Sequence, residues 1–389
     1  MYRIQTQNAI ANIGLSRLDP KDFTVGSEMD SPDGILVRSA DLHSYQIPDS
    51  LRAIARAGAG TNNIPIDRCS EAGIVVMNTP GANANAVKEL VLCSMLMSSR
   101  DILGGIDFVA EQAKLDVDLH KVVEGGKSTF RGPELFGKTI GIIGLGAIGV
   151  EVANACYRLG MEVIGYDPFL SVTTALKLDR HVTATKNLDD IYRNADYITI
   201  HVPYSEATKN FIDQDAISKM RGSVRIINLA RGELVNQDAI LSALQEGRVA
   251  RYVTDFPTKE LVDVKNVIPL PHLGASTPDS EDNCAVMAVD HLKDYLEHGN
   301  IIHSINLPDA VMERSGICRL CLIHKNIPSM LSHIMNVLSD GSVNVENMIN
   351  KSKGDYAYTM LDLNTKLPDT VANELRSIEG VIRVRRLTH

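Results

Sequence analysis

Residues 139–149, Thr-Ile-Gly-Ile-Ile-Gly-Leu-Gly-Ala-Ile-Gly, decide the fold class. An apolar run that suits a buried strand leads into a Gly-x-Gly-x-x-Gly pattern, and a helical segment, Val150–Leu159, follows. In this context Gly144 permits a tight turn, Gly146 lets the backbone approach phosphate groups, and Gly149 lets helix and strand pack closely. The unpaired N–H groups of the helix N-terminus then face the phosphates. The stretch therefore predicts a dinucleotide site.

A carboxylate at the end of the next expected strand indicates which dinucleotide binds. Asp167 follows Gly149 by 18 residues, directly after the run Glu162–Tyr166. From there it can hydrogen-bond an adenosine ribose, and its charge repels the additional phosphate of NADP. We therefore expect NAD. The alternative is a glycine-rich strand-to-helix turn that binds no ligand.

Short apolar runs alternate with helical segments on both sides of this motif. Before it, the expected strands are Gly34–Arg38, Leu51–Ala55 and Ile74–Asn78, followed by a long helix from about Asn85. After it, they are Glu162–Tyr166, Tyr197–Val202, Val224–Leu229, Tyr252–Thr254 and Val267–Leu270. Repeated β-α units predict an α/β fold with a Rossmann-like, doubly wound parallel sheet. A helix should then run from Pro278 to about His298, with Gly299 as its stop.

The last part of the chain has a different pattern. After a linker at 306–316, residues 316–389 read strand, helix, strand, strand, helix, strand, the ferredoxin-like order. Cys318 and Cys321 form a Cys-x-x-Cys within the first of these strands, where residues three apart point to opposite faces. We expect them to be buried apolar side chains rather than a redox or metal site.

Length and composition exclude several classes of protein. A chain of 389 residues predicts two or three domains. The net charge of −9 favours neither nucleic acid nor an anionic membrane surface. The first residues lack the pattern of a signal peptide, no apolar run is long enough to span a membrane, and the six cysteines are scattered. We expect a cytoplasmic protein with reduced thiols and no metal site.

Three residues suited to acid-base and anion chemistry follow expected strands. They are Arg231, Glu260 and His272. Open α/β sheets bind ligands at the carboxyl ends of their strands. An arginine there can hold a carboxylate, and a histidine supported by a carboxylate can take a hydroxyl proton. Taken singly, each has a purely structural alternative, such as a surface ion pair.

With these residues in place, the sequence resembles the D-2-hydroxyacid dehydrogenases that carry a C-terminal ACT domain. The stretches that carry the resemblance are 58–64, 78–81, 137–144, 228–232 and 271–277. The resemblance implies a discontinuous substrate-binding domain (1–83 and 275–305), an NAD-binding domain (84–274) and an ACT domain (316–389). It also implies that Arg231 binds the substrate carboxylate, His272 is the base and Glu260 supports His272. The run at 255–261 keeps the family's spacing between Asp255 and Glu260 but lacks the proline that usually follows the glutamate.

The resemblance also implies which residues contact the ligands. Those implied for the cofactor are Gly144, Gly146, Ala147, Ile148, Gly149, Asp167, His201, Val202, Pro203, Thr208, Leu229, Ala230, Arg231, Asp255, His272 and Gly274. Those implied for the substrate are Arg38, Ser39, Gly60, Thr61, Asn83, Arg231 and His272. In the branch that oxidises D-3-phosphoglycerate, an Arg-Ser pair after an early strand holds the phosphate, which is the expectation for Arg38 and Ser39. The alternatives are a hydroxypyruvate, glyoxylate or other D-2-hydroxyacid dehydrogenase, and a non-catalytic protein that senses NAD.

The ACT domain implies assembly and regulation. In serine-inhibited relatives the positions matched by His324, Asn326 and Asn344 hold the effector. Here Ser329 replaces the usual glycine of that loop, and glycine lets a backbone approach a ligand closely. The alternative is an ACT domain that serves assembly alone. The resemblance implies a homo-oligomer, a dimer or a tetramer.

Overall fold

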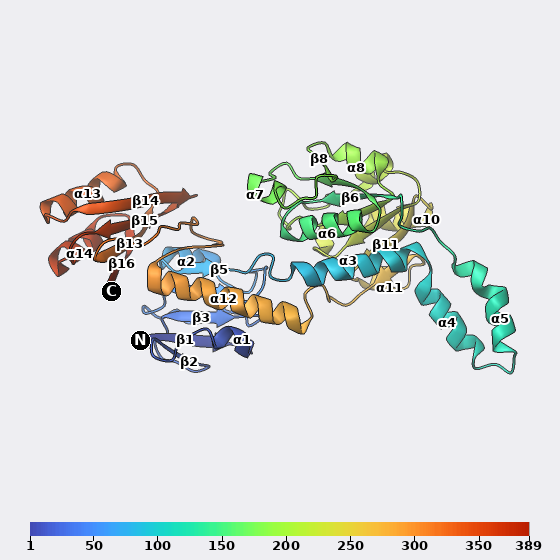
Figure 1. Ribbon diagram of the computed structural model, residues 1–389, viewed down its shortest axis with the longest axis horizontal. Coiled ribbons are helices and arrows are strands. Elements are labelled where there is room, and N and C mark those ends of the chain that lie inside the picture. The colour runs from blue at the N-terminus through green and yellow to red at the C-terminus, as the bar shows by residue number, and fades with distance from the viewer. Residues whose placement is uncertain (389) are drawn as a thin grey trace. The chain divides into compact units, whose positions relative to one another are not determined.

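The computed structural model describes residues 1–388 and divides the chain into two compact units. Unit 1 comprises Met1–Ala82 and the chain from Pro278 onward, and unit 2 comprises Asn83–Thr277. The strands form three sheets within the described residues, one in unit 2 and two in unit 1. Figure 1 labels helices and strands of both units.

Unit 2 is built on a parallel sheet of seven strands. They are β6 (Thr139–Ile143), β7 (Glu162–Tyr166), β8 (Thr183–Thr185), β9 (Tyr197–Ile200), β10 (Val224–Asn228), β11 (Val249–Thr254) and β12 (Val267–Pro269). Their order across the sheet is β12-β11-β10-β9-β6-β7-β8. The strand order reverses between β6 and β9, so this is the switch point at which doubly wound sheets bind ligands. The predicted fold class is confirmed.

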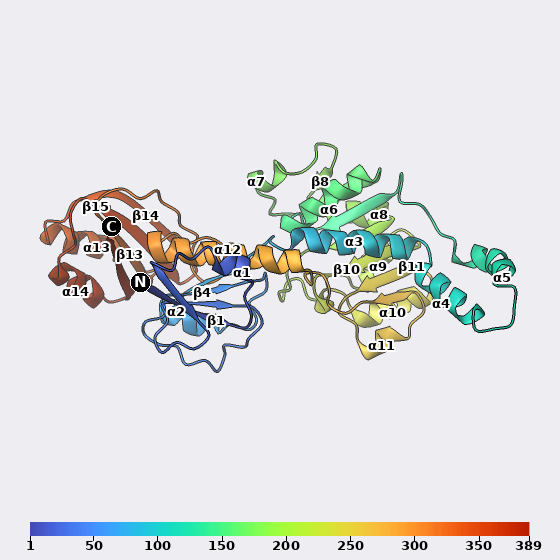
Figure 2. The same ribbon diagram turned by 60° about the horizontal axis from the view of Figure 1, so that its bottom comes forward.

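Unit 2 also contains helices. They are α3 (Ala84–Ser99), α4 (Ile102–Gln112), α5 (Leu119–Gly126), η1 (Lys127–Phe130), α6 (Ala147–Arg158), α7 (Val172–Ala175), α8 (Leu188–Asn194), α9 (Gln214–Lys219), η2 (Gly232–Leu234), α10 (Gln237–Gln245) and α11 (Lys259–Val262). Helices α3 and α6 pack on one face of the sheet through a shared core with Ile140, Ile142 and Val163. By contrast, α4 and α5 bury no residue and project away from the sheet of this unit (Figures 1 and 2).

Unit 1 begins with a second parallel sheet. Its elements are β1 (Tyr2–Gln7), α1 (Asn12–Leu15), β2 (Phe23–Gly26), β3 (Gly34–Val37), β4 (Ala53–Arg56), α2 (Ile66–Glu71), β5 (Val75–Met77) and α12 (Pro278–His298). The strand order is β2-β1-β3-β4-β5. Helix α12 contributes Val289 and Leu292 to the core beneath this sheet, and α1 lies beside it (Figure 2). Helix α12 ends where the sequence predicts, because Gly299 adopts a positive φ of 77°.

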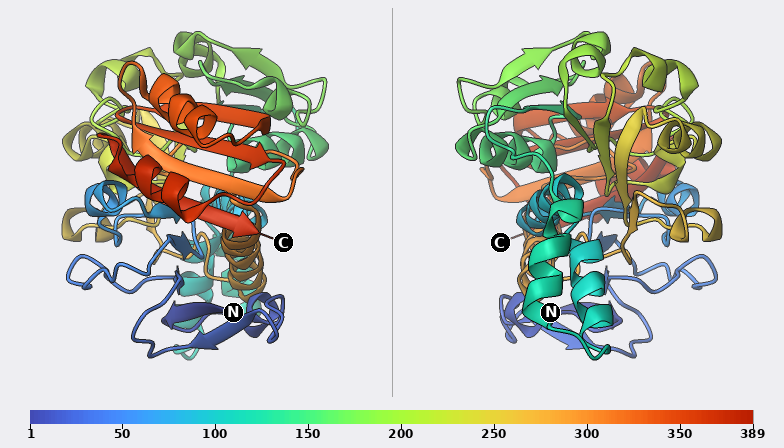
Figure 3. Two further views of the ribbon diagram at one scale, coloured as in Figure 1. Left: turned by 90° about the vertical axis from the view of Figure 1, so that its left-hand side faces the viewer. Right: turned by 90° about the vertical axis from the view of Figure 1, so that its right-hand side faces the viewer.

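The C-terminal part of unit 1 is an antiparallel sheet covered by two helices. Its elements are β13 (Cys318–Lys325), α13 (Met330–Asp340), β14 (Val345–Lys353), β15 (Tyr356–Leu363), α14 (Asp369–Ser377) and β16 (Val381–Thr388). The strand order is β14-β15-β13-β16, and α13 and α14 lie over one face (Figure 3). Cys318 packs with the helices, whereas Cys321 packs in the core shared with the N-terminal sheet. The prediction that these two cysteines face opposite ways is confirmed.

Buried polar side chains fasten this C-terminal sheet to the end of α12. Arg319 and Asp362, both fully buried, form a two-pronged ion pair at 2.7 and 2.8 Å, and Arg319 also donates to the carbonyl of His298 at 2.9 Å. Arg385 donates to the carbonyls of Tyr295 and Leu296, at 3.3 and 3.0 Å. Since the last carbonyls of a helix lack partners within the helix, these donors cap α12.

Candidate active site

The glycine loop that follows β6 has the geometry of a phosphate cradle. Gly144 has a φ of 97°, and a Cβ on it would lie 2.6 Å from the carbonyl oxygen of His201. A Cβ on Gly149 would lie 1.9 Å from the carbonyl oxygen of Gly144, whereas one on Gly146 would meet nothing within 4 Å. Two of the glycines are thus required by packing. The third leaves open space at the N-terminus of α6, where a pyrophosphate fits.

Asp167 is fixed against this loop. Its Oδ2 accepts the backbone N–H of Leu145 at 3.0 Å, and its Oδ1 accepts that of Phe169 at 2.9 Å. The carboxylate therefore stands at the carboxyl end of β7, beside the glycine loop that follows β6. This is the position from which an acidic side chain binds the ribose of a dinucleotide.

Asp255, directly after β11, is a buried carboxylate without a partner. It is 1% exposed, and neither of its oxygens has a hydrogen-bond partner within residues 1–388. Burial raises the pKa of Asp255, while the charge of His272, the nearby backbone N–H groups of Gly274 and of Asp255 itself, and the charge of Arg231 act in the opposite direction. A buried polar group without a partner is costly, and a ligand amide would satisfy it. The open space at Gly146 and this unsatisfied carboxylate both fit a nicotinamide dinucleotide.

The other residues implied for the cofactor lie around the same edge of the sheet. His201 follows β9, and burial lowers its pKa to about 4, so the imidazole is neutral at physiological pH. In the loop beyond it, the Thr208 hydroxyl donates to the carbonyl of Pro203 at 2.9 Å. The remaining ones occupy the first turn of α6 or the loops after β9, β10 and β12: Ala147, Ile148, Val202, Leu229, Ala230 and Gly274.

Arg231 and His272 lie at the same edge of the sheet, after β10 and β12, with β11 between these two strands. Both are exposed, and both contact Phe256: the His272 ring lies 4.6 Å from the Phe256 ring, and the Arg231 guanidinium lies 5.9 Å from it. Asn228 donates to the carbonyl of Arg231 at 2.8 Å and so fixes the turn that carries it. Phe256 was not singled out in the sequence, although an aromatic residue close after the expected strand Tyr252–Thr254 was a usable signal.

Glu260 does not contact His272 in this structure. It is exposed in α11, and its pKa is lowered because its own backbone N–H and then the Thr258 side chain stabilise the charged form. Among the described residues no hydrogen bond or ion pair joins Glu260 to His272. The carboxylate whose charge interacts with His272 is that of Asp255.

In unit 1, Arg38 follows β3 and is already paired. Its Nη2 lies 2.6 Å from Oε1 of Glu281, in the first turn of α12, and the two side chains are 41% and 42% exposed. The backbone N–H of Ser39 donates to the side chain of Asn8 at 3.0 Å. The sequence pattern did not indicate Glu281, because 243 residues separate it from Arg38.

Arg56, at the end of β4, braces the loops that carry several of the residues implied for the substrate. Its Nε donates to the carbonyl of Arg38 at 2.9 Å, and its Nη1 donates to the carbonyl of Gly60. Thr61 lies in the same loop and is half-buried. An arginine at the carboxyl end of a parallel strand was a signal that could have identified this residue. In unit 2, Asn83 precedes α3, and its buried Oδ1 has no partner within the described part of the chain.

The three residues implied for an effector are not together in one chain. His324 is buried, with its ring nitrogens 2.8 Å from the carbonyl of Lys325 and 2.9 Å from the Thr359 hydroxyl. Asn326 donates to the carbonyl of Gly354 at 3.1 Å. Asn344 precedes β14 at the opposite end of the β14–β15 hairpin. At about 3.4 Å per residue, the strand separates the two ends by roughly 20 Å.

The comparisons with known proteins agree with this geometry. Residues 92–274 match the family model described as "D-isomer specific 2-hydroxyacid dehydrogenase, NAD binding domain". The chain is 32% identical over 340 residues to a D-3-phosphoglycerate dehydrogenase of Methanocaldococcus jannaschii, covering 85% of this chain and 62% of the relative. It is 30% identical over 414 residues to the Bacillus subtilis enzyme of that name, covering 100% of this chain and 75% of the relative. It is also 35% identical over 272 residues to a hydroxypyruvate reductase of Thermotoga maritima, covering 67% and 83%.

Solved structures share the fold. The apo D-mandelate dehydrogenase of Rhodotorula graminis aligns with a TM-score of 0.65 at 22% identity, covering 80% of this chain and 98% of that one. The NAD+-bound 3-phosphoglycerate dehydrogenase of Entamoeba histolytica aligns with a TM-score of 0.59 at 24% identity, covering 78% and 98%. The glycine loop, the carboxylate beside it and these relatives lead to one conclusion: the chain belongs to the family of D-isomer-specific 2-hydroxyacid dehydrogenases and carries that family's NAD-binding domain.

Proposed function

We propose that this chain oxidises D-3-phosphoglycerate to 3-phosphohydroxypyruvate with NAD, the first step of L-serine biosynthesis. The observation that carries the proposal is the grouping of Arg231, Asp255 and His272 after three adjacent strands of the sheet that bears the glycine loop. Several curated relatives carry the name D-3-phosphoglycerate dehydrogenase, which supports the choice of substrate. The chain spans 62% of the first of these relatives and 75% of the second.

The chemistry assigns one task to each residue. Bound NAD supplies the acceptor for the hydride that leaves C2 of the substrate. Arg231 binds the substrate carboxylate through its planar N–H groups, which match a carboxylate in geometry. An imidazole nitrogen of His272 accepts the proton of the C2 hydroxyl, so that the C–O bond becomes a carbonyl as the hydride leaves. In the reverse direction His272 returns this proton.

Orientation of His272 is the task proposed for Glu260. To perform it, the Glu260 side chain has to turn from Thr258 toward the imidazole, since no contact joins the two in this structure. The Phe256 ring, 4.6 Å from the His272 ring, already restricts the imidazole from one side. Asp255, without a protein partner, is proposed to accept the carboxamide N–H of the cofactor.

Selectivity for a phosphorylated substrate is assigned to Arg38 and Ser39. Arg38 supplies the charge, and the Ser39 hydroxyl and nearby backbone N–H groups supply further donors. Gly60, Thr61 and Asn83 are proposed to complete the contacts to the substrate. Phosphate binding has to compete with Glu281, which holds Arg38 at 2.6 Å.

That ion pair favours a second candidate function, reduction of hydroxypyruvate or glyoxylate. With Arg38 neutralised by Glu281, an unphosphorylated keto acid binds without displacing anything. The similarity to the Thermotoga hydroxypyruvate reductase agrees with this alternative. A non-catalytic protein that senses NAD is the third candidate, and it predicts cofactor binding without turnover.

Assembly into a homo-oligomer, a dimer or a tetramer, is part of the proposal. Helices α4 and α5 and the segment between them form an arm in which neither helix has a buried residue. In this arm Ile106 and Leu115 are 60% and 56% exposed. Exposed apolar side chains in such number mark a surface that another chain covers. Serine inhibition is proposed at His324, Asn326 and Asn344, and their separation within one chain means that only two copies can bring them together.

The setting is proposed to be the cytoplasm. All six cysteines are free, as expected in a reducing compartment. Within residues 1–388 no helix has the length and apolar character needed to cross a bilayer.

Replacement of the proposed base tests the catalytic assignment. His272→Gln removes the proton acceptor, so turnover should fall by a factor on the order of 10² to 10⁴, whereas NADH binding, followed by its fluorescence, should persist. His333→Gln, on the exposed surface of α13, is the matched control and should leave both unchanged. Equal turnover in the two variants would show that His272 is not the proton acceptor. Binding without turnover in the unmodified protein would favour the NAD-sensing candidate.

A further inference from the structure

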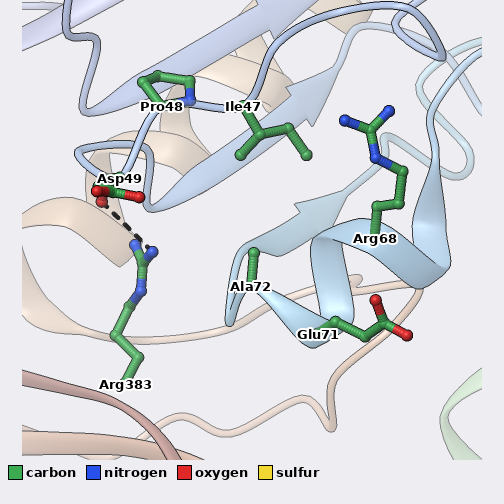
Figure 4. A pocket seen from close by; sticks show the side chains of 7 residues that line it. All are labelled: Ile47, Pro48, Asp49, Arg68, Glu71, Ala72 and Arg383. Carbon is green, nitrogen blue, oxygen red and sulfur yellow. Dashed lines mark hydrogen bonds between the residues drawn. The ribbon is translucent and has the colours of Figure 1, made fainter.

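A cavity lies in unit 1 where the C-terminal sheet meets the N-terminal sheet. Its volume is about 370 Å³, within the range of small-molecule sites. Three segments line it: residues 47–49 of the loop between β3 and β4, the end of α2, and Arg383 of β16 (Figure 4). The lining contains none of the residues assigned above to the cofactor, the substrate or the serine effector.

Two guanidinium groups line the cavity, and backbone carbonyls hold both in place. Arg383 donates to the carbonyls of Leu51 and Asp49, the latter at 3.5 Å. Arg68 donates to the carbonyls of His43 and Tyr45, at 2.7 and 3.3 Å. A guanidinium has five N–H donors, so each of these groups keeps donors for a ligand. Because the carbonyls carry no net charge, the positive charge of both side chains remains available to an anion.

Two carboxylates line the same cavity. Neither Asp49 nor Glu71 has a hydrogen bond or ion pair through its carboxylate within residues 1–388, and Figure 4 shows them on opposite sides of the space. The Asp49 charge does act on Arg383, whose pKa burial lowers. Ile47, Pro48 and Ala72 supply an apolar wall between the charged groups.

The charge pattern selects the class of ligand. A simple anion attracted by the two arginines is repelled by Asp49 and Glu71, and a simple cation is repelled by the arginines. A small molecule that carries both charges pairs with an arginine and a neighbouring carboxylate at once, and the apolar wall accommodates a short hydrocarbon side chain. We propose that this cavity binds a free α-amino acid, with its carboxylate on Arg383 and its ammonium on Asp49, which Figure 4 shows side by side.

An occupant of this cavity would connect the two sheets of unit 1. Arg383 lies two residues before Arg385 on β16, and Arg385 holds the carbonyls at the end of α12. A ligand that bridges the 47–49 loop and β16 therefore stabilises the junction at which β16 and α12 meet. Binding should raise the melting temperature, because a ligand bound to the native state alone stabilises it. The proposal goes beyond the dehydrogenase activity and does not depend on it.

Binding is measured directly on the full-length protein. The probes are the individual L-amino acids at millimolar concentration, followed by ligand-observed NMR and by thermal unfolding. At least one of them should bind and raise the melting temperature, and its 2-hydroxy acid analogue, which lacks the ammonium, should bind at least tenfold more weakly. No binding by any of the amino acids overturns the proposal. Equal binding of inorganic phosphate or of the hydroxy acid also overturns it, since the site would then recognise an anion alone.

Variants then locate the site. Asp49→Asn removes the ammonium partner without a change of shape and should weaken binding by about tenfold or more, the value of one charged hydrogen bond. Glu374→Gln, on α14 over the other face of the C-terminal sheet, is the matched control and should have no effect. Loss of binding in Asn344→Ala, with retention in Asp49→Asn, would place the ligand on the proposed effector residues and overturn the inference.

Discussion

The pairing of Arg38 with Glu281 gives the sharpest prediction about substrate selectivity. If Arg38 binds the substrate phosphate, then in Glu281→Gln the guanidinium is released and the phosphorylated substrate should bind more tightly. Asp279→Asn, in the same exposed first turn of α12, changes the net charge equally but leaves the ion pair intact. It is therefore the matched control.

The size of the effect follows from the exposure of the pair. With both side chains about two-fifths exposed, water and salt screen the interaction. Exposed pairs of this kind contribute about 0.2 to 1 kcal/mol, which corresponds to a change in affinity of roughly 1.4-fold to 5-fold. Removal of the Glu281 charge also reduces its repulsion of the incoming phosphate, which acts in the same direction.

Steady-state kinetics with NADH measure this effect. In Glu281→Gln the KM for 3-phosphohydroxypyruvate should fall by a factor in that range, with the KM for hydroxypyruvate unchanged, and the gain should shrink in high salt. Equal changes for the two substrates would show that Arg38 does not contact the phosphate. The same change in Asp279→Asn would show that the effect comes from the change in net charge and not from the loss of the ion pair.

Three further predictions concern the cofactor and the stability of the fold. Asp167→Ser should weaken NADH binding by roughly tenfold to a hundredfold, the value of a charged hydrogen bond, and reduce the preference over NADPH. Ser329→Gly should raise the free energy of unfolding by roughly 0.5 kcal/mol, since Ser329 has a φ of 65° that glycine adopts without strain. Asp362→Asn should lower that free energy by about 3 kcal/mol or more, because it leaves the fully buried Arg319 charge without its partner.

Titration of the two cofactors by fluorescence checks the first of these, and urea unfolding checks the other two. An unchanged cofactor preference would show that Asp167 does not bind the ribose. A loss of stability in Ser329→Gly would mean that the serine side chain makes a contact worth more than the backbone strain. An unaltered midpoint in Asp362→Asn would mean that the ion pair is replaceable by hydrogen bonds alone.

Much of the fold could be predicted because its local signals agree with its long-range packing. Strand β7, for example, is a short run bounded by turn residues, and its ends coincide with the predicted ones. The first strand, Tyr2–Gln7, was missed because its polar residues mask the single fully buried side chain, Ile4. The arm of α4 and α5 was missed because it buries nothing against its own unit.

The candidate site shows where prediction from sequence stops. A spacing of residues places Arg231 and His272 at one sheet edge, because parallel strands end together. The spacing of residues in the sequence does not determine the orientation of the Glu260 side chain. In this structure its carboxylate interacts with its own backbone N–H and with Thr258 instead of His272. Nor does it reveal that Glu281 lies against Arg38, because that contact depends on the position of α12 in the folded unit.

The proposed function is tested most directly by the oxidation of NADH with 3-phosphohydroxypyruvate, compared with hydroxypyruvate and glyoxylate under the same conditions. We expect a strong preference, in kcat/KM, for the phosphorylated keto acid. Turnover of the unphosphorylated acids alone would refute the proposed substrate and would assign the chain to a reductase branch of its family.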